Sequence, residues 1–233
     1  MTRPVKRKKA LPKREAQFEI KPIPKIGLKR REQQRSIDTR TTIICAALAE
    51  FAEKGFEAAS IRCIAQRTGL QHPLITYHYR TKDILWRAVA EHLFAEIKRK
   101  TPPVNSTLSA RDYVRERLRN LFYFTVDYQD FHQFMLRENR PNNPRLSWLI
   151  ERFLRPALRD ILPKIEEAQR TGHLPPSDPI LVHYMLIGIT SALSSLGSEI
   201  KEIARIEPDA PDVVGAYWEL IDMTVFGRKA CRD

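Results

Sequence analysis

The sequence has few cysteines and no long apolar run. Its longest apolar stretches, IICAALAEF and MLIGITSALSSL, fall short of the about 20 residues that a membrane-spanning helix needs, and no cleavable signal sequence opens the chain. We therefore expect no membrane segment and a cytoplasmic protein. The three cysteines, Cys45, Cys63 and Cys231, lack metal-type spacing, which argues against a disulfide scaffold. We interpret Cys45 and Cys63 as small buried side chains, with a redox-sensing pair as the alternative.

The patterns of catalytic and metal sites are also missing. No nucleophile–base pair, phosphate-binding loop or His/Cys/carboxylate cluster with metal spacing is visible, so the sequence predicts no enzyme, no cofactor and no metal. Glycine is scarce as well, with 8 residues against 16 prolines, and this balance indicates helices that begin and end at prolines. An apolar content of 42% is ordinary for a globular protein.

Positive charge is concentrated at the start of the chain. Residues 1–36 contain 13 Lys and Arg against 3 Glu, so they carry +10 of the net +12, and the remaining 197 residues carry about +2. Four prolines and the absence of periodicity in this stretch predict a disordered basic arm. The arm could clamp DNA phosphates or enter a minor groove, and the alternative is a solvating tail without a target.

Beyond the arm, helical periodicity predicts an all-α fold in two domains. The first, residues 37–100, contains a helix over 37–54 that Gly55 ends, a helix-turn-helix over 60–79 and a helix from a Thr81 cap to about Lys100. Pro102 and Pro103 mark the boundary. The second domain, residues 104–233, shows no internal repeats and contains further helices that begin near Ser109, Tyr128, Asn143, Asp178 and Pro211, with a bend at Pro156 or Pro163 in the third of them.

The stretch from Ser60 to Tyr79, SIRCIAQRTGLQHPLITYHY, is the centre of the first domain. Ser60 is a good N-cap, Gly69 supplies a left-handed residue that ends the first short helix, and Pro73 lies in the first turn of the second. Two short helices joined in this way can place the second one in the DNA major groove.

The segment Thr39–Leu85 resembles the DNA-binding domain of tetracycline-repressor-like (TetR family) regulators. The resemblance lies in a first helix that ends in AEFAEKGF, the S-I-R-x-I-A-x-R-x-G-L segment and the Y-H-Y-R-T-K-D exit, in that order. It implies a DNA-binding transcriptional regulator with a helical C-terminal domain. The rest of the chain resembles the family only in helical character and length.

The resemblance assigns DNA contacts residue by residue. Arg62 is similar to residues that reach a base or phosphate, and Lys82 is similar to a lysine that grips a phosphate. The recognition helix and its entry contain Gln71, His72, Pro73, Leu74, Thr76, Tyr77 and His78. Gln71 and His72 can bond base edges, Leu74 can touch a thymine methyl, and Tyr77 and His78 suit phosphates. We expect Ile75 and Tyr79 to be core. Pro73, Leu74 and Thr76 depart from the family's usual residues, which leaves the target sequence open.

For the second domain the resemblance implies a homodimer that binds a small effector. The predicted dimer residues are Met185, Gly188, Ala192, Tyr217 and Trp218, and the predicted effector-binding residues are Phe122, Tyr123, Phe131, Phe134, Met135, Trp148 and Tyr184. In both sets the alternative is plain intramolecular core. Few ionisable residues fall among the apolar faces, so the pattern favours an uncharged or amphipathic organic effector, with His132 and His183 as candidate polar partners.

Two functions of different classes follow from these patterns. The first is a homodimeric transcriptional regulator, a repressor released by its effector, that binds double-stranded DNA at a near-palindromic operator. The second is an effector-independent architectural DNA-binding protein that relies on its basic arm.

Overall fold

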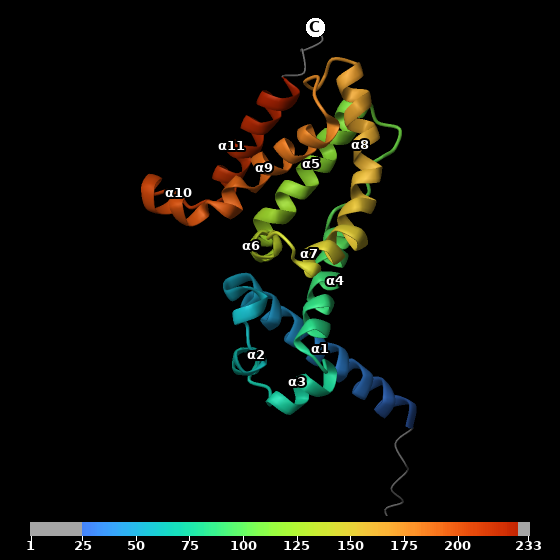
Figure 1. Ribbon diagram of the computed structural model, residues 1–233, viewed down its shortest axis with the longest axis vertical. Helices are drawn as coiled ribbons and strands as arrows, with labels where there is room; N and C mark the ends of the chain where they lie inside the picture. The colour runs from blue at the N-terminus through green and yellow to red at the C-terminus, as the bar shows by residue number, and fades with distance from the viewer. Residues whose placement is uncertain (1–24, 228–233) are drawn as a thin grey trace, which may run out of the picture. The chain divides into compact units, whose positions relative to one another are not determined.

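The computed structural model describes residues 25–227 of the chain. All regular structure in that range is helical, which confirms the predicted all-α class (Figure 1). In chain order the elements are α1 Lys25–Ala58, α2 Ile61–Thr68, α3 His72–His78, α4 Lys82–Lys100, α5 Ala110–Asp127, α6 Gln129–Glu138, α7 Pro144–Leu149, the π-helical turn η1 Ile150–Leu154, α8 Arg155–Arg170, α9 Pro179–Ser195, α10 Gly197–Ala204, α11 Pro211–Ile221 and the π-helical turn η2 Asp222–Phe226.

The basic arm differs from its prediction at its C-terminal end. Residues up to Asp38 form one unit and Thr39–Asp233 another, and within the first unit the helix already begins at Lys25 rather than at residue 37. The sequence from residue 25 to 36 has no proline and is rich in Lys, Arg, Gln and Glu, which are good helix formers even without an apolar stripe. Residues 1–24 lie outside the described range.

The predicted helix ends are confirmed around α2. The Ser60 hydroxyl accepts a bond from the Cys63 amide at 3.1 Å, and Gly69 closes the helix with a φ of 68°. Gly55 has a φ of 74°, so it breaks the helical geometry where we expected the first helix to end, although one more turn follows as far as Ala58. The interpretation of the cysteines as buried is wrong for Cys45, which is exposed on α1, and Cys63 is only half-buried.

The apolar side chains of the unit Thr39–Asp233 form two cores. The first unites α1 to α4 with residues from beyond the Pro102–Pro103 pair, namely Phe124, Phe131, Phe134 and Leu149. Trp86 is fully buried in it, with its ring 5.4 Å from Phe134 and 5.8 Å from Trp148. The prolines therefore follow the end of α4, but the core of the N-terminal helices continues across them.

The second core holds α5, α8, α9 and α11 together. Its buried residues include Phe122, Ile165, Leu186 and Trp218. Figure 1 shows α9 and α11 beside α5 in this half, with α10 extending away from them. We did not expect α10, which meets α9 at 58°. No single helix in the described part is long and apolar enough to cross a membrane, although the bent pair α9–α10 meets the length and composition criteria together.

The predicted long helix from Asn143 to Gly172 is interrupted. The π-helical turn η1 ends two residues before Pro156, which lies in the first turn of α8, while Pro163 lies inside α8. Proline has no amide hydrogen and its ring crowds the carbonyl four residues earlier, so a locally widened turn before Pro156 accommodates the ring.

A buried carboxylate joins α6 to α4 and α7. Glu138 accepts bonds from the Trp86 indole nitrogen at 3.1 Å, from Asn143 Nδ2 at 2.7 Å and from Arg145 Nε at 3.0 Å. The Arg145 guanidinium also lies 3.9 Å from the centre of the Phe56 ring. Glu138 therefore fixes the C-terminal end of α6 against the N-terminal helices.

We expect Glu138→Ala to lower the free energy of unfolding by about 3–5 kcal/mol, because it leaves Arg145 and the Trp86 N–H without their buried acceptor. Urea denaturation measures the change. Glu91→Ala, an exposed glutamate on α4, is the control and should change stability by less than about 0.5 kcal/mol. Equal effects of the two substitutions would contradict the role assigned to Glu138.

Candidate nucleic-acid interface and ligand cavity

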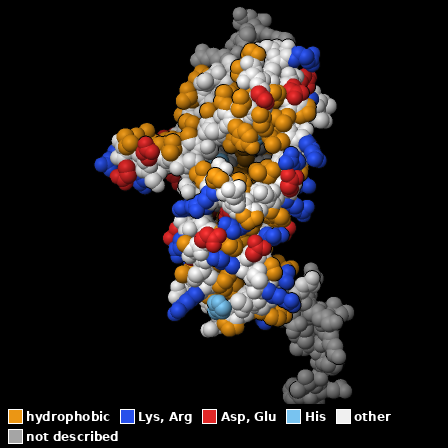
Figure 2. All heavy atoms as spheres, in the orientation of Figure 1, with side chains coloured by type: hydrophobic (Ala, Val, Ile, Leu, Met, Phe, Trp, Pro, Cys, Tyr) orange, Lys and Arg blue, Asp and Glu red, His pale blue; other side chains and the backbone are white. Residues whose placement is uncertain are grey.

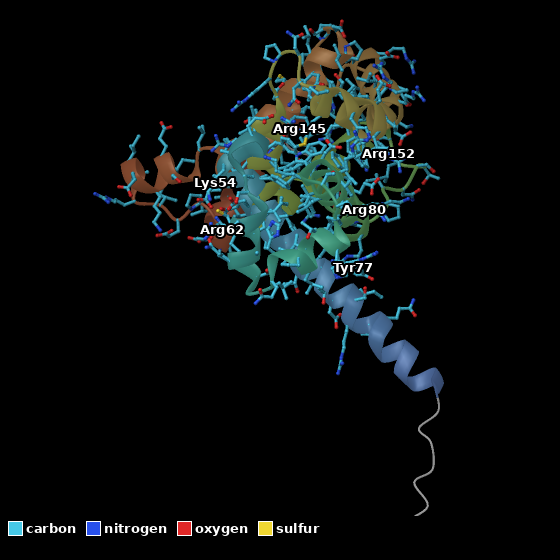
Figure 3. All side chains as sticks on the ribbon, turned by 60° about the horizontal axis from the view of Figure 1, so that its bottom comes forward. Lys54, Arg62, Tyr77, Arg80, Arg145 and Arg152 are labelled. Carbon is cyan, nitrogen blue, oxygen red and sulfur yellow. The ribbon has the colours of Figure 1, made fainter. Side chains whose placement is uncertain are left out.

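The helix pair α2–α3 presents one buried and one exposed side. Ile64, Ala65, Ile75 and Tyr79 are buried in the first core, as expected for Ile75 and Tyr79. Exposed around them are most of the predicted contact residues, namely Arg62, Gln71, His72, Pro73, Leu74 and Tyr77. The Tyr77 side chain is 80% exposed, and the ring contact found for it is an edge contact with the neighbouring His78 at 5.4 Å. Figure 3 shows Arg62 on α2 and Tyr77 on α3.

Two further residues of α3 are half-buried. The Thr76 hydroxyl donates to the carbonyls of His72 and Pro73, at 3.2 and 3.0 Å, and so helps to hold its own helix. Burial, together with the nearby positive charge of Arg40, lowers the pKa of His78 from its ordinary value. His78 is therefore neutral at pH 7 and offers hydrogen bonds rather than charge to a phosphate.

The role predicted for the Lys82 side chain is not supported. Its ammonium donates to the carbonyls of Phe56, Glu57 and Ala59 at 2.8, 3.2 and 3.1 Å, and it lies 4.6 Å from the centre of the Phe56 ring. Three carbonyl acceptors use its three donors, so Lys82 caps the end of α1 instead of remaining available to a phosphate.

Two exposed arginines extend the surface and were missed by sequence reasoning. Arg80 follows α3 directly, as Figure 3 shows. Arg40 lies on α1, far from α3 in the sequence, but its charge acts on both His78 and Tyr79. The Arg in the Y-H-Y-R-T-K-D exit could have indicated Arg80, whereas only the packing of α1 places Arg40 nearby. Figure 2 shows Lys, Arg and His side chains over the end of the unit that carries α2 and α3.

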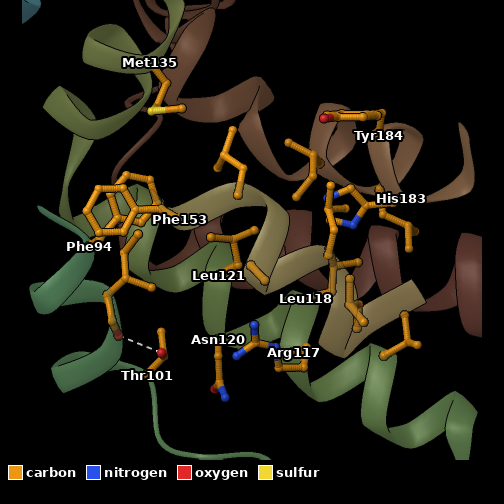
Figure 4. A pocket seen from close by; sticks show the side chains of 18 of the residues that line it. Phe94, Thr101, Arg117, Leu118, Asn120, Leu121, Met135, Phe153, His183 and Tyr184 are labelled. Carbon is orange, nitrogen blue, oxygen red and sulfur yellow. Dashed lines mark hydrogen bonds between the residues drawn. The ribbon is translucent and has the colours of Figure 1, made fainter. Parts of the chain in front are cut away.

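A cavity of about 310 Å³ lies between the helices of the C-terminal half (Figure 4). It is lined by Phe94, Ile97, Thr101, Val114, Arg117, Leu118, Asn120, Leu121, Phe131, His132, Met135, Phe153, Leu154, Ala157, Leu158, Ile161, Ile165, His183, Tyr184, Leu186 and Ile187. The walls are mostly apolar with a few polar groups, which is the character of small-molecule sites.

Three of the seven predicted effector-binding residues line this cavity: Phe131, Met135 and Tyr184. The other four, Phe122, Tyr123, Phe134 and Trp148, do not. Phe122 is core and stacks on Trp218, Tyr123 is exposed at its side, and Phe134 and Trp148 pack on Trp86. An aromatic stripe at helical spacing does not reveal which ring faces a cavity and which faces a neighbouring helix.

The two histidines named as candidate polar partners both line the cavity. His132 is 8% exposed, its Nε2 has no hydrogen-bond partner, and burial lowers its pKa from 6.5 to about 4. Burial and the positive charge of Arg117 also lower the pKa of His183. Both rings are therefore neutral at pH 7, which leaves each with one donor and one acceptor nitrogen.

The predicted dimer residues divide between surface and core. Met185 and Gly188 are exposed on α9, and Ala192 is partly exposed. Trp218 is buried in the second core, and the Tyr217 hydroxyl donates to the Ile189 carbonyl at 2.8 Å while its ring stacks on Phe122. The buried position of Trp218 contradicts its predicted interface role, because its side chain packs on Phe122 of its own chain. Tyr217 is half-buried, and its interface role stays a prediction.

Metal sites need several ligands close together. Among the residues that the structure describes, no group of three or more His, Cys, Asp or Glu side chains is arranged to hold a metal ion.

Comparison with known proteins gives a family match over the N-terminal helices. Residues 43–89 match the model for bacterial regulatory proteins of the tetR family. The chain is 22% identical over 162 residues to the HTH-type transcriptional regulator YhgD of Bacillus subtilis, a match that covers 68% of this chain and 83% of that protein. It is 42% identical over 62 residues to the HTH-type transcriptional repressor Rv3405c of Mycobacterium tuberculosis, covering 27% of this chain and 33% of the repressor.

Solved structures extend the likeness to most of the fold. The structure of AibR in complex with isovaleryl coenzyme A and operator DNA has a TM-score of 0.67 and 14% sequence identity, over 82% of this chain and 99% of that chain. At this level of identity the likeness concerns the fold alone.

We expect the buried, neutral His132 to make stability depend on pH. The pKa of about 4 in the folded protein lies below the ordinary 6.5, so unfolded chains bind the proton first and stability falls as the pH drops below 6.5 toward 4. Between pH 7 and pH 5 the parent protein should lose about 2 kcal/mol more than His132→Leu, as measured by urea denaturation. If the stability of the two proteins changed in parallel with pH, His132 would not be the source of the pH dependence.

Proposed function

We propose that this chain, which is a DNA-binding regulator of the TetR family, acts as a homodimeric repressor of transcription. It binds a near-palindromic operator and is released when a small organic effector occupies the cavity. The observation that carries the proposal is the course of α4, which three residues separate from the recognition helix α3 and which lines the cavity near its other end.

Sequence-specific DNA binding is assigned to the exposed side of α2–α3. His72, Tyr77 and Arg62 are free to meet DNA, and Arg80 adds positive charge beside them. The amide groups at the N-terminus of α4 remain a second place for a phosphate, since a helix N-terminus attracts anions whatever the Lys82 side chain does. A protein with this role needs access to the chromosome, so the proposal includes a cytoplasmic location.

Dimerisation is assigned to one face of α9 and α11. Large apolar side chains on these helices are exposed to solvent, several of them three or four residues apart. An exposed apolar stripe of this kind is typical of an interface with another subunit. The exposed side chains are Leu181, Tyr184, Met185 and Leu196 from α9 and its C-cap, and Leu220 and Met223 from α11 and η2. A Cβ added at Gly188 would meet nothing within 4 Å, so a partner helix has room to approach there.

Effector release is assigned to the two helices that touch both regions. Helix α4 spans about 28 Å at 1.5 Å per residue, and its Phe94 and Ile97 line the cavity. Helix α6 lines the cavity through Phe131 and Met135, and the Arg137 guanidinium that follows donates to the carbonyls of Ala52 and Glu53 at 3.2 and 2.7 Å. A ligand that shifts either helix therefore moves groups that hold α1 and the recognition helix. The solved complex of AibR with isovaleryl coenzyme A and operator DNA supports this arrangement by analogy.

The experiment starts from DNA fragments that the full chain selects from a genomic library. We expect the double variant His72→Ala/Tyr77→Ala to bind the selected fragment about 5- to 150-fold more weakly, as the loss of one good contact set of 1–3 kcal/mol implies. Gel shifts measure the affinity. His173→Ala, an exposed histidine in the loop after α8, is the control and should bind like the parent protein.

Retained specific binding by the double variant would refute the assigned recognition surface. An architectural DNA binder would give a different pattern, with affinity that survives scrambling of the selected sequence and disappears on removal of residues 1–24, which precede α1. Salt dependence measured on the same samples separates the two, because non-specific binding is almost entirely electrostatic.

For the dimer, we expect Met185→Glu/Leu220→Glu to convert the protein into a monomer at micromolar concentration. If the double variant dimerised, the two introduced carboxylates of each subunit would be buried without partners in the apolar interface. Sedimentation equilibrium measures the mass. Leu136→Glu is the control, since Leu136 is a similarly exposed leucine on α6, a helix that is not part of the assigned face. A dimer that persists in the double variant would place the interface elsewhere.

A further inference from the structure

The cavity contains an unbalanced positive charge. Among the residues that line it, Arg117 is the one side chain that is charged at pH 7, and no Asp or Glu is present. Both lining histidines are neutral at that pH for the reasons given above. A cation beside apolar walls favours an anion in the space that it faces.

Arg117 differs from the other arginines of α5, all of which have acceptors. The pairs are Arg111 with the Phe226 carbonyl at 2.7 Å, Arg115 with Asp222 at 2.7 Å, and Arg119 with Glu116 at 3.8 Å. Among residues 33–227, whose side chains the structure describes, no hydrogen bond or ion pair is found for the Arg117 guanidinium. Asn120 lies one turn further along α5, and Figure 4 shows both side chains at the same end of the cavity. A planar guanidinium without a partner, next to an amide, suits a carboxylate.

A second observation comes from another helix. His132 of α6 is more than nine-tenths buried, it lines the cavity, and its Nε2 has no hydrogen-bond partner. A buried polar group without a partner costs about 1–3 kcal/mol, so ligand oxygen or nitrogen within reach would recover that loss. The cavity thus has one cationic group and one neutral hydrogen-bonding group for its occupant, both otherwise unused.

The remaining walls and the volume limit the rest of the ligand. Aliphatic and phenyl side chains from α4, α5, α8 and α9 supply most of the lining. About 310 Å³ lies at the small end of the usual range for ligand sites, roughly 300–1,000 Å³. The body of the ligand is therefore apolar and of short to medium length.

We infer that the effector is a small organic acid with an apolar body, whose carboxylate is held by Arg117 and which hydrogen-bonds to His132. This inference rests on the proposed function, because it names the chemical class of the ligand for the effector site. It also changes the expectation of an uncharged or amphipathic effector to an amphipathic anion.

The test uses calorimetry on the full chain at pH 7.5 with hexanoate, octanoate and decanoate, and with the alcohols and amines of the same chain lengths. We expect the acids to bind about tenfold more tightly than the alcohols, and the amines to bind least, since one charged contact contributes on the order of tenfold. Arg117→Gln should abolish the preference for acid over alcohol and leave alcohol binding unchanged. Arg119→Gln, two residues away and outside the cavity lining, is the matched control and should keep the preference.

A second pair of variants locates the binding. Leu121→Trp fills the cavity and should abolish acid binding, whereas Leu136→Trp, at an exposed position outside the cavity, should not. Equal affinity for acids and alcohols, an unchanged preference in Arg117→Gln, or no binding of any acid at millimolar concentration would each overturn the inference.

Gel shifts with the selected DNA separate this inference from the proposed function. If octanoate binds in an Arg117-dependent way but leaves the DNA affinity unchanged, the inferred class of ligand is supported and the proposed release of DNA by the effector is refuted. If the alcohols reduce the DNA affinity as strongly as the acids do, the proposed release of DNA by the effector is supported and the inferred class of ligand is refuted.

Discussion

The buried carboxylate of Glu138 is the contact on which the arrangement of the compact unit depends. It receives hydrogen bonds from α4, from the turn before α7 and from α7 itself, and it lies at the last residue of α6. A buried carboxylate needs every one of these donors, so the helices cannot move apart without leaving a charge unpaired. The N-terminal helices and the cavity are for this reason parts of one packed structure.

This packing connects the N-terminal helices with the cavity, which are the two regions that the proposed function uses. The first core takes side chains from both sides of the Pro102–Pro103 pair, and Phe94 at its edge stacks on Phe153 at a ring distance of 4.1 Å in the cavity wall. Packed interiors respond to a ligand by shifts of whole helices rather than by local compression. In the proposed mechanism, occupation of the cavity reaches α1 and α3 through these packed helices, without an extended chain of polar groups.

The cavity and the proposed dimer face also meet. Tyr184 lines the cavity and is 55% exposed on the same apolar stripe of α9 as Met185. A partner subunit on that face would restrict the cavity's opening, so ligand affinity and dimerisation are expected to influence each other in this fold. The charged Arg117 and the neutral His132 of the cavity belong to α5 and α6, which are not helices of that face.

The sequence by itself determined the local structure and the likeness of residues 43–89 to bacterial regulatory proteins of the tetR family. Ser60, Gly69 and Thr81 act through hydrogen bonds and backbone angles within a few residues, so the helix ends around α2 and α3 could be read from the sequence. The predicted DNA contacts came from the family resemblance instead. Periodicity also identified Ile75 and Tyr79 as core, because a buried face repeats along one helix.

Only the tertiary structure decided which partners distant residues meet. Lys82 caps α1 across 26 residues of sequence, Trp218 packs on Phe122 of its own chain, and the charge of Arg40 acts on His78. The same holds for the cavity: Arg117 and His132 are ordinary polar residues in their own helices, and they become a site because α5 and α6 leave both unpaired beside the same space. Pairing between helices depends on their packing, which local sequence does not encode.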